Sequence, residues 1–455
     1  MAHVSPIYKK GNKAAVNNYR PVSLTCVLCK VLEKIVREKV INHLIENDII
    51  TPHQHGFVPG RSCTTQLLES LDEWTSILED NGSVDVIYTD FQKAFDSVPH
   101  KRLALKLEAC GIRGNVLKWI QDFLDGRKQK VVINGCESSE GNVTSGIPQG
   151  SVLGPLLFVI FINDLPRGLK TVAKIFADDT KVYVRSDDED GPKNLQEDID
   201  TLQEWSDRWL LRFHPDKCCV LKIGKANSNE YQMGNQEKGT RITLKETVKE
   251  KDLGVMIDNK LSFKDHVAQA TAKGNRMVGL IRRSFDYLNE RTFVLLFKSM
   301  VRPLLEYGNT VWQPLLKSLE SEIEDVQRRA TKTLSHLKDK PYAERLRTLK
   351  LPCLEHRRRR GNMIETYKFI HGHYKVLRPE FKRATTSQLR GNSYKLQKER
   401  CDTRLRANYF SNRVINDWNS LPDRVVNAPS VDSFKRRLDD HWKHLPSIYE
   451  PTCQR

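Results

Sequence analysis

Apolar and polar residues alternate over two short runs near the middle of the chain, residues 172–177 and 180–184. Alternation with a period of two is typical of β-strands, and two such runs around a two-residue polar turn predict a β-hairpin. The turn consists of two adjacent aspartates, Asp178 and Asp179. Because like charges side by side repel each other, two carboxylates at a hairpin tip indicate a site that receives a cation.

Longer stretches show apolar residues at the spacing of three to four that is typical of helices. They predict helices over residues 25–46, 64–80, 103–110, 116–124 and 194–211. Short apolar runs predict strands over residues 84–89, 131–134, 142–145 and 252–258, and the polar segment 224–238 is expected to be a linker. This order, with acidic residues on central antiparallel strands, predicts an α+β fold with a split βαβ core.

The chain is strongly basic, since its 455 residues carry a net charge of +17. An excess of this size favours a polyanionic partner such as nucleic acid. The longest apolar stretch, residues 152–162, is too short to span a bilayer, and the first ten residues lack the apolar centre of a signal peptide. We therefore expect an intracellular protein, nuclear or cytoplasmic, that has no membrane partner.

Neither the cysteines nor the histidines suggest a zinc site. Cys26 and Cys29 have the spacing of one half-site, but no second pair follows them. They fall in the apolar pattern of the first predicted helix with Leu32, so we expect both to be small buried residues. His53 and His55 lack partners at zinc spacing, and we expect them at the surface.

A third carboxylate, Asp90, directly follows the predicted strand 84–89. Two strand ends therefore carry three acidic groups. Carboxylate oxygens are the ligands that Mg²⁺ prefers, and two Mg²⁺ ions are the usual apparatus of nucleotidyl transfer. We predict that Asp90, Asp178 and Asp179 are catalytic residues and ligands of two Mg²⁺ ions, for which Mn²⁺ is a substitute.

Between these carboxylates lies a bent loop rich in glycine and proline, and the apolar run 156–162 continues it as a helix or a buried segment. "TDFQKAFDSV", "SGIPQGSVLGPLLF" and "FADD" resemble the successive palm motifs of reverse transcriptases from non-LTR retrotransposons, the jockey type of LINE element. "NNYRPVSL" and "HGFVPGRS" resemble the fingers motifs of that family, and "LRFHPDKC" resembles its motif with a lysine behind the active site. The ordered set covers roughly residues 4–224.

The resemblance implies an RNA-directed DNA polymerase shaped as a right hand with fingers, palm and thumb. Such an enzyme adds dNTPs to the 3′-hydroxyl of a DNA primer on an RNA template. Complete elements of this family carry an endonuclease upstream, whereas this chain begins almost at the fingers motifs. We therefore expect polymerase activity without endonuclease activity. A separate endonuclease or an element-encoded RNA-binding protein is then the expected protein partner.

The same resemblance implies roles for residues around the carboxylates. Phe95 is expected to pack against the sugar and exclude a 2′-hydroxyl, while Gln149 and Gly150 line the incoming nucleotide and the template. Cationic side chains are expected to clamp the triphosphate and to protonate the pyrophosphate. The nucleotide-binding residues implied in this way are Lys9, Lys10, Arg20, Phe95, Gln149, Gly150 and Lys217.

We expect three parts: fingers and palm at residues 1–224, a thumb and connecting region at 225–340, and a basic helical region at 341–455. "LEYGNTVWQP", "RVINDWNSLP" and "FKRRLDDHW" resemble the region that follows the polymerase in jockey-type elements, but they assign no chemistry. Arg61 is predicted to touch the template backbone. The run Arg357, Arg358, Arg359 and Arg360 contacts phosphates or forms a solvated helix face.

Two other classes of function remain open from the residues. The first is a catalytically inactive, retroelement-derived protein that binds nucleic acid; the three intact aspartates and the Pro-Gln-Gly turn argue against it. The second is a nuclease of the RNase H or transposase type, which also uses clustered carboxylates. Such a nuclease needs neither adjacent aspartates at a hairpin tip nor a Ser-Gly-x-Pro-Gln-Gly loop.

Overall fold

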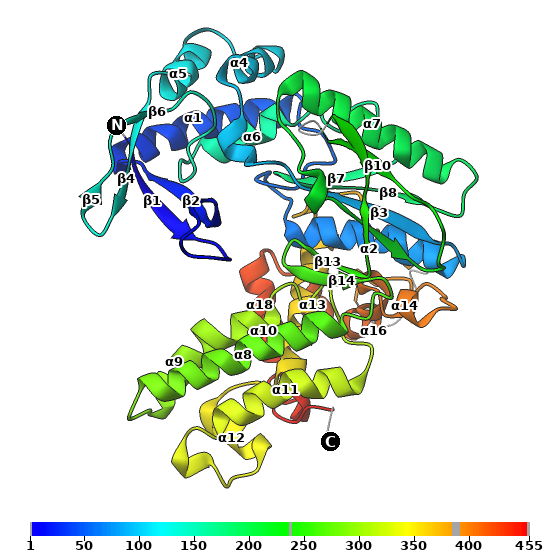
Figure 1. The fold of residues 1–455 in the computed structure, drawn as a ribbon. Helices are drawn as coiled ribbons and strands as arrows, with labels where there is room; N and C mark the ends of the chain where they lie inside the picture. The colour runs from blue at the N-terminus through cyan, green and yellow to red at the C-terminus, as the bar shows by residue number, and fades with distance from the viewer. Residues whose placement is uncertain (1, 236–238, 385–391, 453–455) are drawn as a thin grey trace. The chain divides into compact units, whose positions relative to one another are not determined.

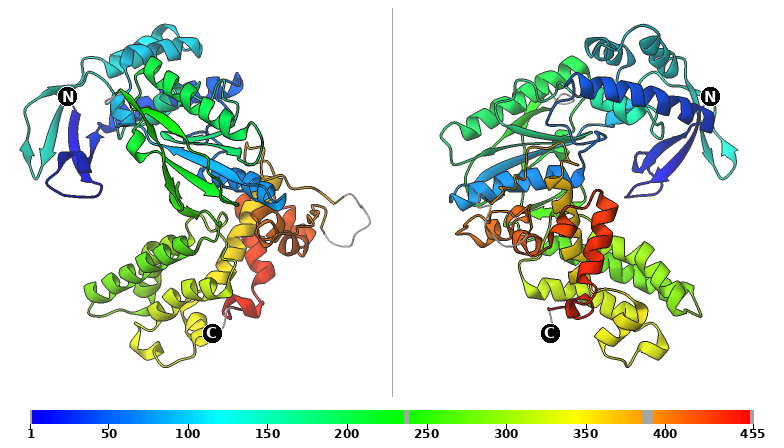
Figure 2. Two further views of the ribbon diagram at one scale, coloured as in Figure 1. Left: turned by 45° about the vertical axis from the view of Figure 1, so that its right-hand side comes forward. Right: turned by 180° about the vertical axis from the view of Figure 1, so that it is seen from behind.

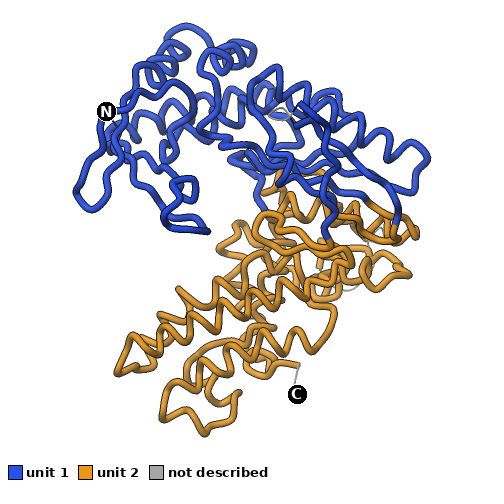
Figure 3. The backbone as a smooth tube through the Cα atoms, viewed as in Figure 1, with its two compact units in different colours: residues 1–63, 85–220, 227–247 blue, residues 64–84, 221–226, 248–455 orange. Residues whose placement is uncertain are grey.

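The computed structural model describes residues 2–235, 239–384 and 392–452. They form two compact units, coloured separately in Figure 3. The first unit contains residues 1–63, 85–220 and 227–247, and the second contains residues 64–84, 221–226 and 248–455. This division differs from the expected one, because residues 64–84 belong with the C-terminal half of the chain.

The first sheet of the first unit is built on the hairpin of β1 (Ala2–Tyr8) and β2 (Tyr19–Leu24). The two strands pair antiparallel, with Ile7 opposite Arg20 and Tyr8 opposite Tyr19. β1 also pairs in parallel with β4 (Lys128–Ile133), which in turn pairs with β5 (Cys136–Glu137) and β6 (Gly141–Asn142). The hairpin leaves its tip, residues 9–18, as a projecting loop (Figure 1).

The second sheet has the strand order β12-β9-β3-β8-β7. Its strands are β3 (Val84–Thr89), β7 (Val172–Phe176), β8 (Asp179–Arg185), β9 (Cys219–Ile223) and β12 (Lys245–Thr247). β7 and β8 pair antiparallel with Phe176 opposite Asp179, so the predicted hairpin is confirmed. β3 lies next to β8, and the Thr89 hydroxyl donates to the Thr180 carbonyl at 3.2 Å, so the end of β3 and the tip of the hairpin meet at one end of the sheet.

Helices cover this framework in the first unit. They are α1 (Val27–Glu46), α3 (Ala94–Ser97), α4 (His100–Ala109), α5 (Gly114–Leu124), α6 (Gly154–Phe161) and α7 (Gly191–Trp209). α6 is buried on all sides, so the apolar run after the bent loop is both a helix and a core segment. α7 contacts β8, and its Leu195, Ile199 and Leu202 are buried, as its apolar spacing predicts.

The first half of α1 departs from its sequence pattern. Leu28 is 81% exposed and Leu32 is 46% exposed, Cys26 is exposed and Cys29 is only partly buried. The expectation that Cys26 and Cys29 are buried was therefore wrong for Cys26 and only partly correct for Cys29. Val40, Ile41 and Leu44 in the second half of the helix pack into the core, whereas the first half contributes the buried Glu33 and leaves Leu28 and Leu32 exposed.

The segment predicted to be a linker is largely ordered. Asn227, Asn229 and Tyr231 donate hydrogen bonds of 2.8, 3.1 and 2.7 Å to the buried carboxylate of Asp85. A buried carboxylate needs such donors, so this segment is anchored to β3. It continues into β10 (Gln232–Asn235), which pairs with β11 (Thr240–Thr243); residues 236–238 of the predicted linker lie outside the described residues.

The single strand predicted over 252–258 is a hairpin instead. β13 (Lys249–Asp252) and β14 (Val255–Asp258) pair antiparallel around Leu253 and Gly254. Both turn residues have left-handed backbone angles, with φ of +43° and +90°. A two-residue turn of this hand matches the twist of a hairpin, and the Asp-Leu-Gly-Val sequence supplies a glycine at its second position.

The second unit is mostly helical. Its longer helices are α2 (Cys63–Glu79), α8 (Lys264–Ser284), α11 (Lys317–Thr331), α13 (Leu354–Ile370) and α18 (Val431–Trp442). The short helices α9 (Glu290–Leu296), α10 (Arg302–Glu306), α12 (Tyr342–Leu349), α14 (Arg404–Ala407), α15 (Phe410–Arg413), α16 (Ile415–Asn419) and α17 (Asp423–Val426) connect them. α8 packs against α10 and α11, and α13 lies beside α18 in both views of Figure 2.

Polar contacts tie α2 to the C-terminal segment of the same unit. Arg406 forms an ion pair of 2.7 Å with the buried carboxylate of Asp72, and the Tyr409 hydroxyl donates to the Leu68 carbonyl at 2.7 Å. The carboxylate of Glu79 accepts the backbone N–H of Thr403 at 3.0 Å. Residues 403–409 therefore form part of the environment of α2. No helix in the described ranges is both long and apolar enough to cross a membrane.

Candidate active site

Asp90 and Asp178 lie near each other at the end of the sheet where β3 ends and the β7–β8 turn begins. Asp178 follows Ala177, which holds a left-handed φ of +54° at the start of the turn between β7 and β8. Burial raises the pKa of Asp178, and the negative charge of Asp90 raises that pKa further. Two carboxylates from strands far apart in sequence therefore act on each other at one site.

Asp179 occupies a different position. It is the first residue of β8 and its side chain is exposed. Within the described residues, no group of three or more His, Cys, Asp or Glu side chains could hold a metal ion. The structure thus associates Asp90 with Asp178, while the three-ligand set with Asp179 stays a prediction.

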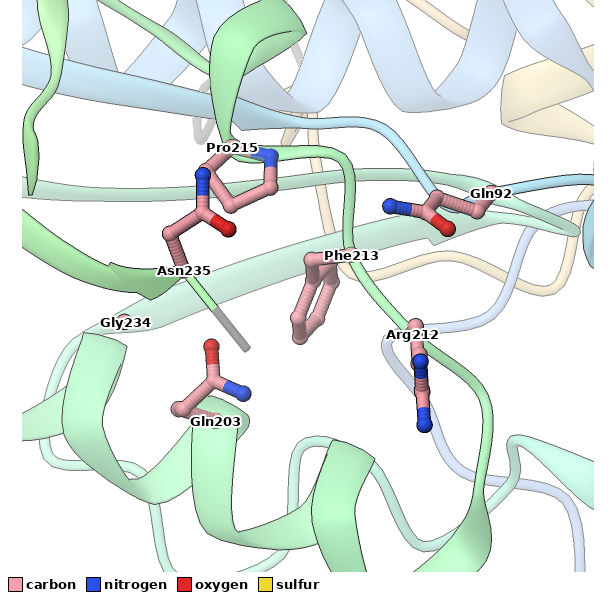
Figure 4. A pocket seen from close by; sticks show the side chains of 7 residues that line it. All are labelled: Gln92, Gln203, Arg212, Phe213, Pro215, Gly234 and Asn235. Atoms are coloured by element: carbon pink, nitrogen blue, oxygen red, sulfur yellow. The ribbon is translucent and has the colours of Figure 1, made fainter. Parts of the chain in front are cut away.

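Lys217 lies directly beside Asp90. Its ammonium group donates to Asp90 Oδ2 at 3.0 Å. The preceding residues 212–214 run along the backbone of residues 90–92, because the His214 N–H donates to the Asp90 carbonyl at 2.7 Å. A small pocket beside this pairing is lined by Gln92, Arg212 and Phe213, among others (Figure 4). It contains none of the predicted site residues, so we assign it no ligand.

The β1–β2 hairpin supplies two further positive charges of the site. Arg20 and Lys9 both act to lower the pKa of Asp178, against the effects of burial and of Asp90. The Tyr8 and Tyr19 rings meet edge to face at 5.6 Å, and the Tyr8 hydroxyl donates to the Gly11 carbonyl at 2.6 Å. The loop that carries Lys9 is therefore held by its own contacts, and Arg20 follows it in β2.

The bent loop joins this site through Gln149 and Gly150. The Ser23 N–H in β2 donates to the Gln149 carbonyl at 2.7 Å, and a Cβ atom at Gly150 would lie 2.7 Å from the Ser23 carbonyl oxygen. Gly150 also has a φ of +104°, so only glycine fits this position without strain. The loop is thereby fastened to the strand that carries Arg20.

Phe95 lies beside the same loop. Its ring stacks on Phe158 of α6 at 4.5 Å with an angle of 14° between the rings, and it remains only partly buried. Its carbonyl accepts the Ile147 N–H at 2.7 Å. One face of the ring is thus fixed by packing.

The sequence was compared with known protein families and curated proteins. The family model "Reverse transcriptase (RNA-dependent DNA polymerase)" matches residues 7–257, which is more than half of the chain. The chain belongs to the reverse transcriptase family. Its α+β architecture is that of a right-hand polymerase.

Curated relatives of this reverse transcriptase come from non-LTR retrotransposons. The RNA-directed DNA polymerase from mobile element jockey of Drosophila melanogaster is 29% identical over 371 residues, which are 78% of this chain and 40% of that protein. The probable RNA-directed DNA polymerase from transposon BS of the same species is 27% identical over 77% of this chain and 39% of its own length. The chain spans about two fifths of the length of these relatives.

A solved structure is also similar to this reverse transcriptase. The structure of apo telomerase from Candida tropicalis is 10% identical, with a TM-score of 0.43, over 76% of this chain and 61% of that chain.

The arginines predicted to bind nucleic acid have partners within the reverse transcriptase. Arg61 donates to the carbonyls of Thr51 and Gln54 at 2.9 and 2.6 Å. In α13, Arg357, Arg359 and Arg360 pair with Glu306, Asp417 and Asp439, each through an Nη2 bond of 2.8 Å, and Arg358 is buried. These contacts favour a structural role, and a buried Arg358 cannot reach a phosphate without unfolding its surroundings.

Two residues that support the site were missed at the level of sequence. Glu33 of α1 is fully buried and accepts the N–H groups of Val152 and Leu153 at 2.7 and 2.9 Å, which fastens the bent loop. Its only sequence signal was an acidic residue on the same helix face as Val36 and Val40.

Gln54 supports the hairpin tip. Its side-chain Oε1 accepts the Ala177 N–H at 3.0 Å, directly before Asp178. The neighbouring residues His53 and His55 exchange backbone hydrogen bonds of 2.9 and 2.8 Å with Ile175 in β7. His55 is therefore buried rather than at the surface as expected, because it belongs to an extra strand pairing that no local pattern announces.

Proposed function

We propose that this reverse transcriptase is an RNA-directed DNA polymerase that adds dNTPs to the 3′-hydroxyl of a DNA primer on an RNA template. The observation that carries the proposal is the pairing of Asp90 with Asp178 at one sheet edge, within the electrostatic reach of Arg20 and Lys9. Negative charge for metal ions and positive charge for phosphates therefore meet at one place. A separate endonuclease or an RNA-binding protein remains the proposed protein partner.

Reverse transcriptases generally use divalent metal ions, and the residues at this edge fit such ions. Asp178 is a desolvated carboxylate next to a second carboxylate, which is why its pKa is raised. A divalent cation would relieve both unfavourable effects. We propose that Asp90 and Asp178 hold Mg²⁺, with Asp179 as the third ligand and Mn²⁺ as a substitute. When bound, the ions supply charge stabilisation for nucleotidyl transfer.

The protein's own side chains then bind and orient the nucleotide. Lys9 and Arg20 are proposed to hold the triphosphate, for which the guanidinium of Arg20 offers two parallel donors. Lys10 is exposed in the hairpin loop and remains an alternative to Lys9. Lys217, which pairs with Asp90 in this structure, is proposed to turn to the pyrophosphate and protonate it.

The template side of the site follows from the bent loop. Gln149 and Gly150 are proposed to line the incoming nucleotide and the template, and Phe95 is proposed to pack against the sugar. The RNA–DNA hybrid would be gripped by its shape and backbone rather than by its sequence, since side chains cannot read the deep, narrow major groove of an A-form helix. The net charge of +17 supports such contacts.

Primer extension on an RNA template tests the proposal. The purified protein should extend a DNA primer in Mg²⁺, and Asp178→Ala should abolish extension while RNA binding stays nearly unchanged, because the change removes a ligand and no basic group. Asp122→Ala, at an exposed site on α5, is the matched control and should extend normally. Primer extension by Asp178→Ala at the wild-type rate would refute the assignment of Asp178. A wild-type protein that binds RNA but never extends the primer would instead be the catalytically inactive, nucleic-acid-binding alternative.

A further inference from the structure

We infer that Asp96 is a positioning residue that decides which end of the Gln149 side-chain amide faces the nucleotide. The inference rests on the proposed polymerase function. It concerns a carboxylate that belongs neither to the metal site nor to the phosphate site. Asp96 lies in α3, directly after Phe95.

The contact itself is a side-chain hydrogen bond between two motifs that are 53 residues apart. Gln149 Nε2 donates to Asp96 Oδ1 at 3.0 Å. Asp96 is partly buried, and burial raises its pKa, while the bond from Gln149 and the charge of Lys93 counteract that rise. A desolvated carboxylate that accepts one amide donor gains more from this bond than an exposed one would.

The backbone keeps the two side chains in register. The Gly146 N–H donates to the Val98 carbonyl at 2.8 Å, and the Ser145 hydroxyl donates to the Asp96 carbonyl at 3.0 Å. A Cβ atom at Gly146 would lie 2.6 Å from that same carbonyl oxygen, so a glycine is required for this approach. On the other side of the loop, Ser23 holds the Gln149 carbonyl. Gln149 is therefore fixed at its backbone on one side and at its amide nitrogen on the other.

The polarity of the pair carries the inference. An ionised carboxylate only accepts hydrogen bonds, whereas a glutamine amide has a donor end and an acceptor end. The nitrogen of Gln149 must therefore face Asp96, and its Oε1 must point the other way. No hydrogen bond to this Oε1 is found among the residues that the structure describes. An asparagine at position 96 could both donate and accept, so it would not impose this orientation.

Gln149 Oε1, as an oriented acceptor next to Phe95, would accept a hydrogen bond from a donor on the nucleotide. If Phe95 packs against the sugar, the nearest donor is the 3′-hydroxyl, which is the only hydroxyl on the deoxyribose of a dNTP. An amino group on a base is the other source of the same chemistry. The adjacency of the loop to Phe95, through the 2.7 Å bond from Ile147, favours the sugar.

Exchange of the two side chains tests the orientation. Gln149→Glu places two carboxylates against each other and should lower kcat/KM for dNTPs at least about 10-fold, the loss expected for a broken bond to a charged group. Adding Asp96→Asn restores a donor facing an acceptor and should recover most of that loss. Asp122→Asn is the control for loss of a carboxylate at an exposed position. Additive losses in the double variant would overturn the inference.

Nucleotide analogues identify the donor. Asp96→Asn and Asp96→Ala should reduce the preference for dTTP over its 2′,3′-dideoxy analogue several-fold, with the change mainly in KM, because a merely destabilised enzyme would lose both substrates equally. If the variants change only the preference for dGTP over dITP, which lacks the 2-amino group, the orientation is supported and the donor is the amino group of the base. Unchanged ratios in both comparisons would overturn the inference. Failure of the wild-type enzyme to extend any primer would instead refute the proposed function.

Discussion

The carboxylates of this chain differ in their surroundings, and those surroundings decide what each can do. Asp178 is desolvated and repelled by Asp90, which raises its pKa, whereas Asp423 accepts bonds from Ser393 that lower its pKa. Asp85 is buried but fully supplied with donors. Of these three carboxylates, Asp178 is the one that combines desolvation with a second negative charge nearby, which is typical of a catalytic carboxylate rather than a structural one.

Phe95 offers a test at the scale of one side chain. Phe95→Ala should raise the efficiency of ribonucleotide incorporation relative to deoxyribonucleotide incorporation, because removing the ring opens space beside the 2′ carbon. The measurement is the ratio of kcat/KM for rNTP and dNTP on the same primer and template. Phe95→Tyr keeps the bulk and should leave the ratio nearly unchanged. A constant ratio in Phe95→Ala would mean that the ring serves only to pack on Phe158.

Short connections, more than long elements, assemble the site. The bent loop is held at Glu33 and Ser23, which belong to α1 and β2, while the hairpin tip is held at Gln54. These contacts come from segments before β3 in the chain, so the residues predicted to form the fingers also support the bent loop and the β7–β8 hairpin. By contrast, Leu28 and Leu32 in the first half of α1 are exposed, so an apolar pattern alone does not bury a side chain.

Gly150 provides a test at the scale of this loop. Gly150→Ala should lower primer-extension efficiency at least about 10-fold, because the added methyl group meets the Ser23 carbonyl and a φ of +104° is strained for alanine. Gly126→Ala is the matched control, since Gly126 also has a positive φ, +63°, but no neighbour lies within 4 Å of its added Cβ atom. Equal effects of the two changes would show that strain, and not the contact with β2, causes the loss.

Across the whole molecule, the C-terminal segment is part of the folded structure and not an appendage. Residues 403–409 form hydrogen bonds and an ion pair with α2. In α13, Arg357, Arg359 and Arg360 form ion pairs with carboxylates of the same chain. Ending the chain near residue 224 would therefore remove partners of α2 together with positive charge. Loss of nucleic-acid affinity in such a truncated protein would not by itself identify a binding surface.

The ion pair between Arg406 and Asp72 tests this interpretation. Arg406→Ala leaves the buried carboxylate of Asp72 with Arg378, at 3.2 Å, as its other ion-pair partner, so we expect a cost of about 2 kcal/mol, below that of an unpaired buried charge. The free energy of unfolding, measured by urea titration, should fall by that amount. Lys443→Ala, on the exposed surface after α18, should change it by less than about 0.5 kcal/mol. An unchanged unfolding midpoint in Arg406→Ala would show that α2 is stable without the C-terminal segment.

Stability of the second unit should depend on pH through its buried histidines. Burial, reinforced by nearby cations, lowers the pKa of His266 to about 4, and His266 Nδ1 accepts the Met256 N–H at 3.2 Å. The unfolded chain binds a proton near pH 6.5, whereas the folded protein does not until about pH 4. Stability should therefore fall as the pH drops from about 6.5 to 4, by an amount on the order of 3 kcal/mol for this group.

Thermal unfolding between pH 7.5 and 4.5 measures this effect. His266→Gln, which remains neutral throughout, should lose part of the pH dependence even if its stability at pH 7.5 is lower. His356 has a pKa lowered in the same way to about 4, so His356→Gln should flatten the curve similarly. If stability depends on pH in the same way in the wild type and both variants, these two histidines do not cause the pH dependence.

The sequence by itself determined the features that depend on local pattern. Alternation predicted the β7–β8 hairpin, helical spacing predicted α2, α5 and α7, and the ordered motifs identified the family. The positions of Asp90 and Asp178 at strand ends also followed, because strand boundaries are visible in the residue types. Local pattern failed where a turn interrupts an apolar run, as at Leu253 and Gly254, and where no partner covers an apolar face, as on α1.

Only the tertiary structure decided which polar groups meet. The hydrogen bonds that Ala177 donates to Gln54, Val152 to Glu33 and Gln149 to Asp96 each join residues at least 50 positions apart. Such bonds leave no periodic signal, because a single buried polar residue is compatible with many partners until the chain is packed. For the same reason the Arg357–Arg360 run had the pattern of a phosphate-binding surface or of a solvated helix face, and only the packed structure shows that Arg357, Arg359 and Arg360 pair with carboxylates of the same chain.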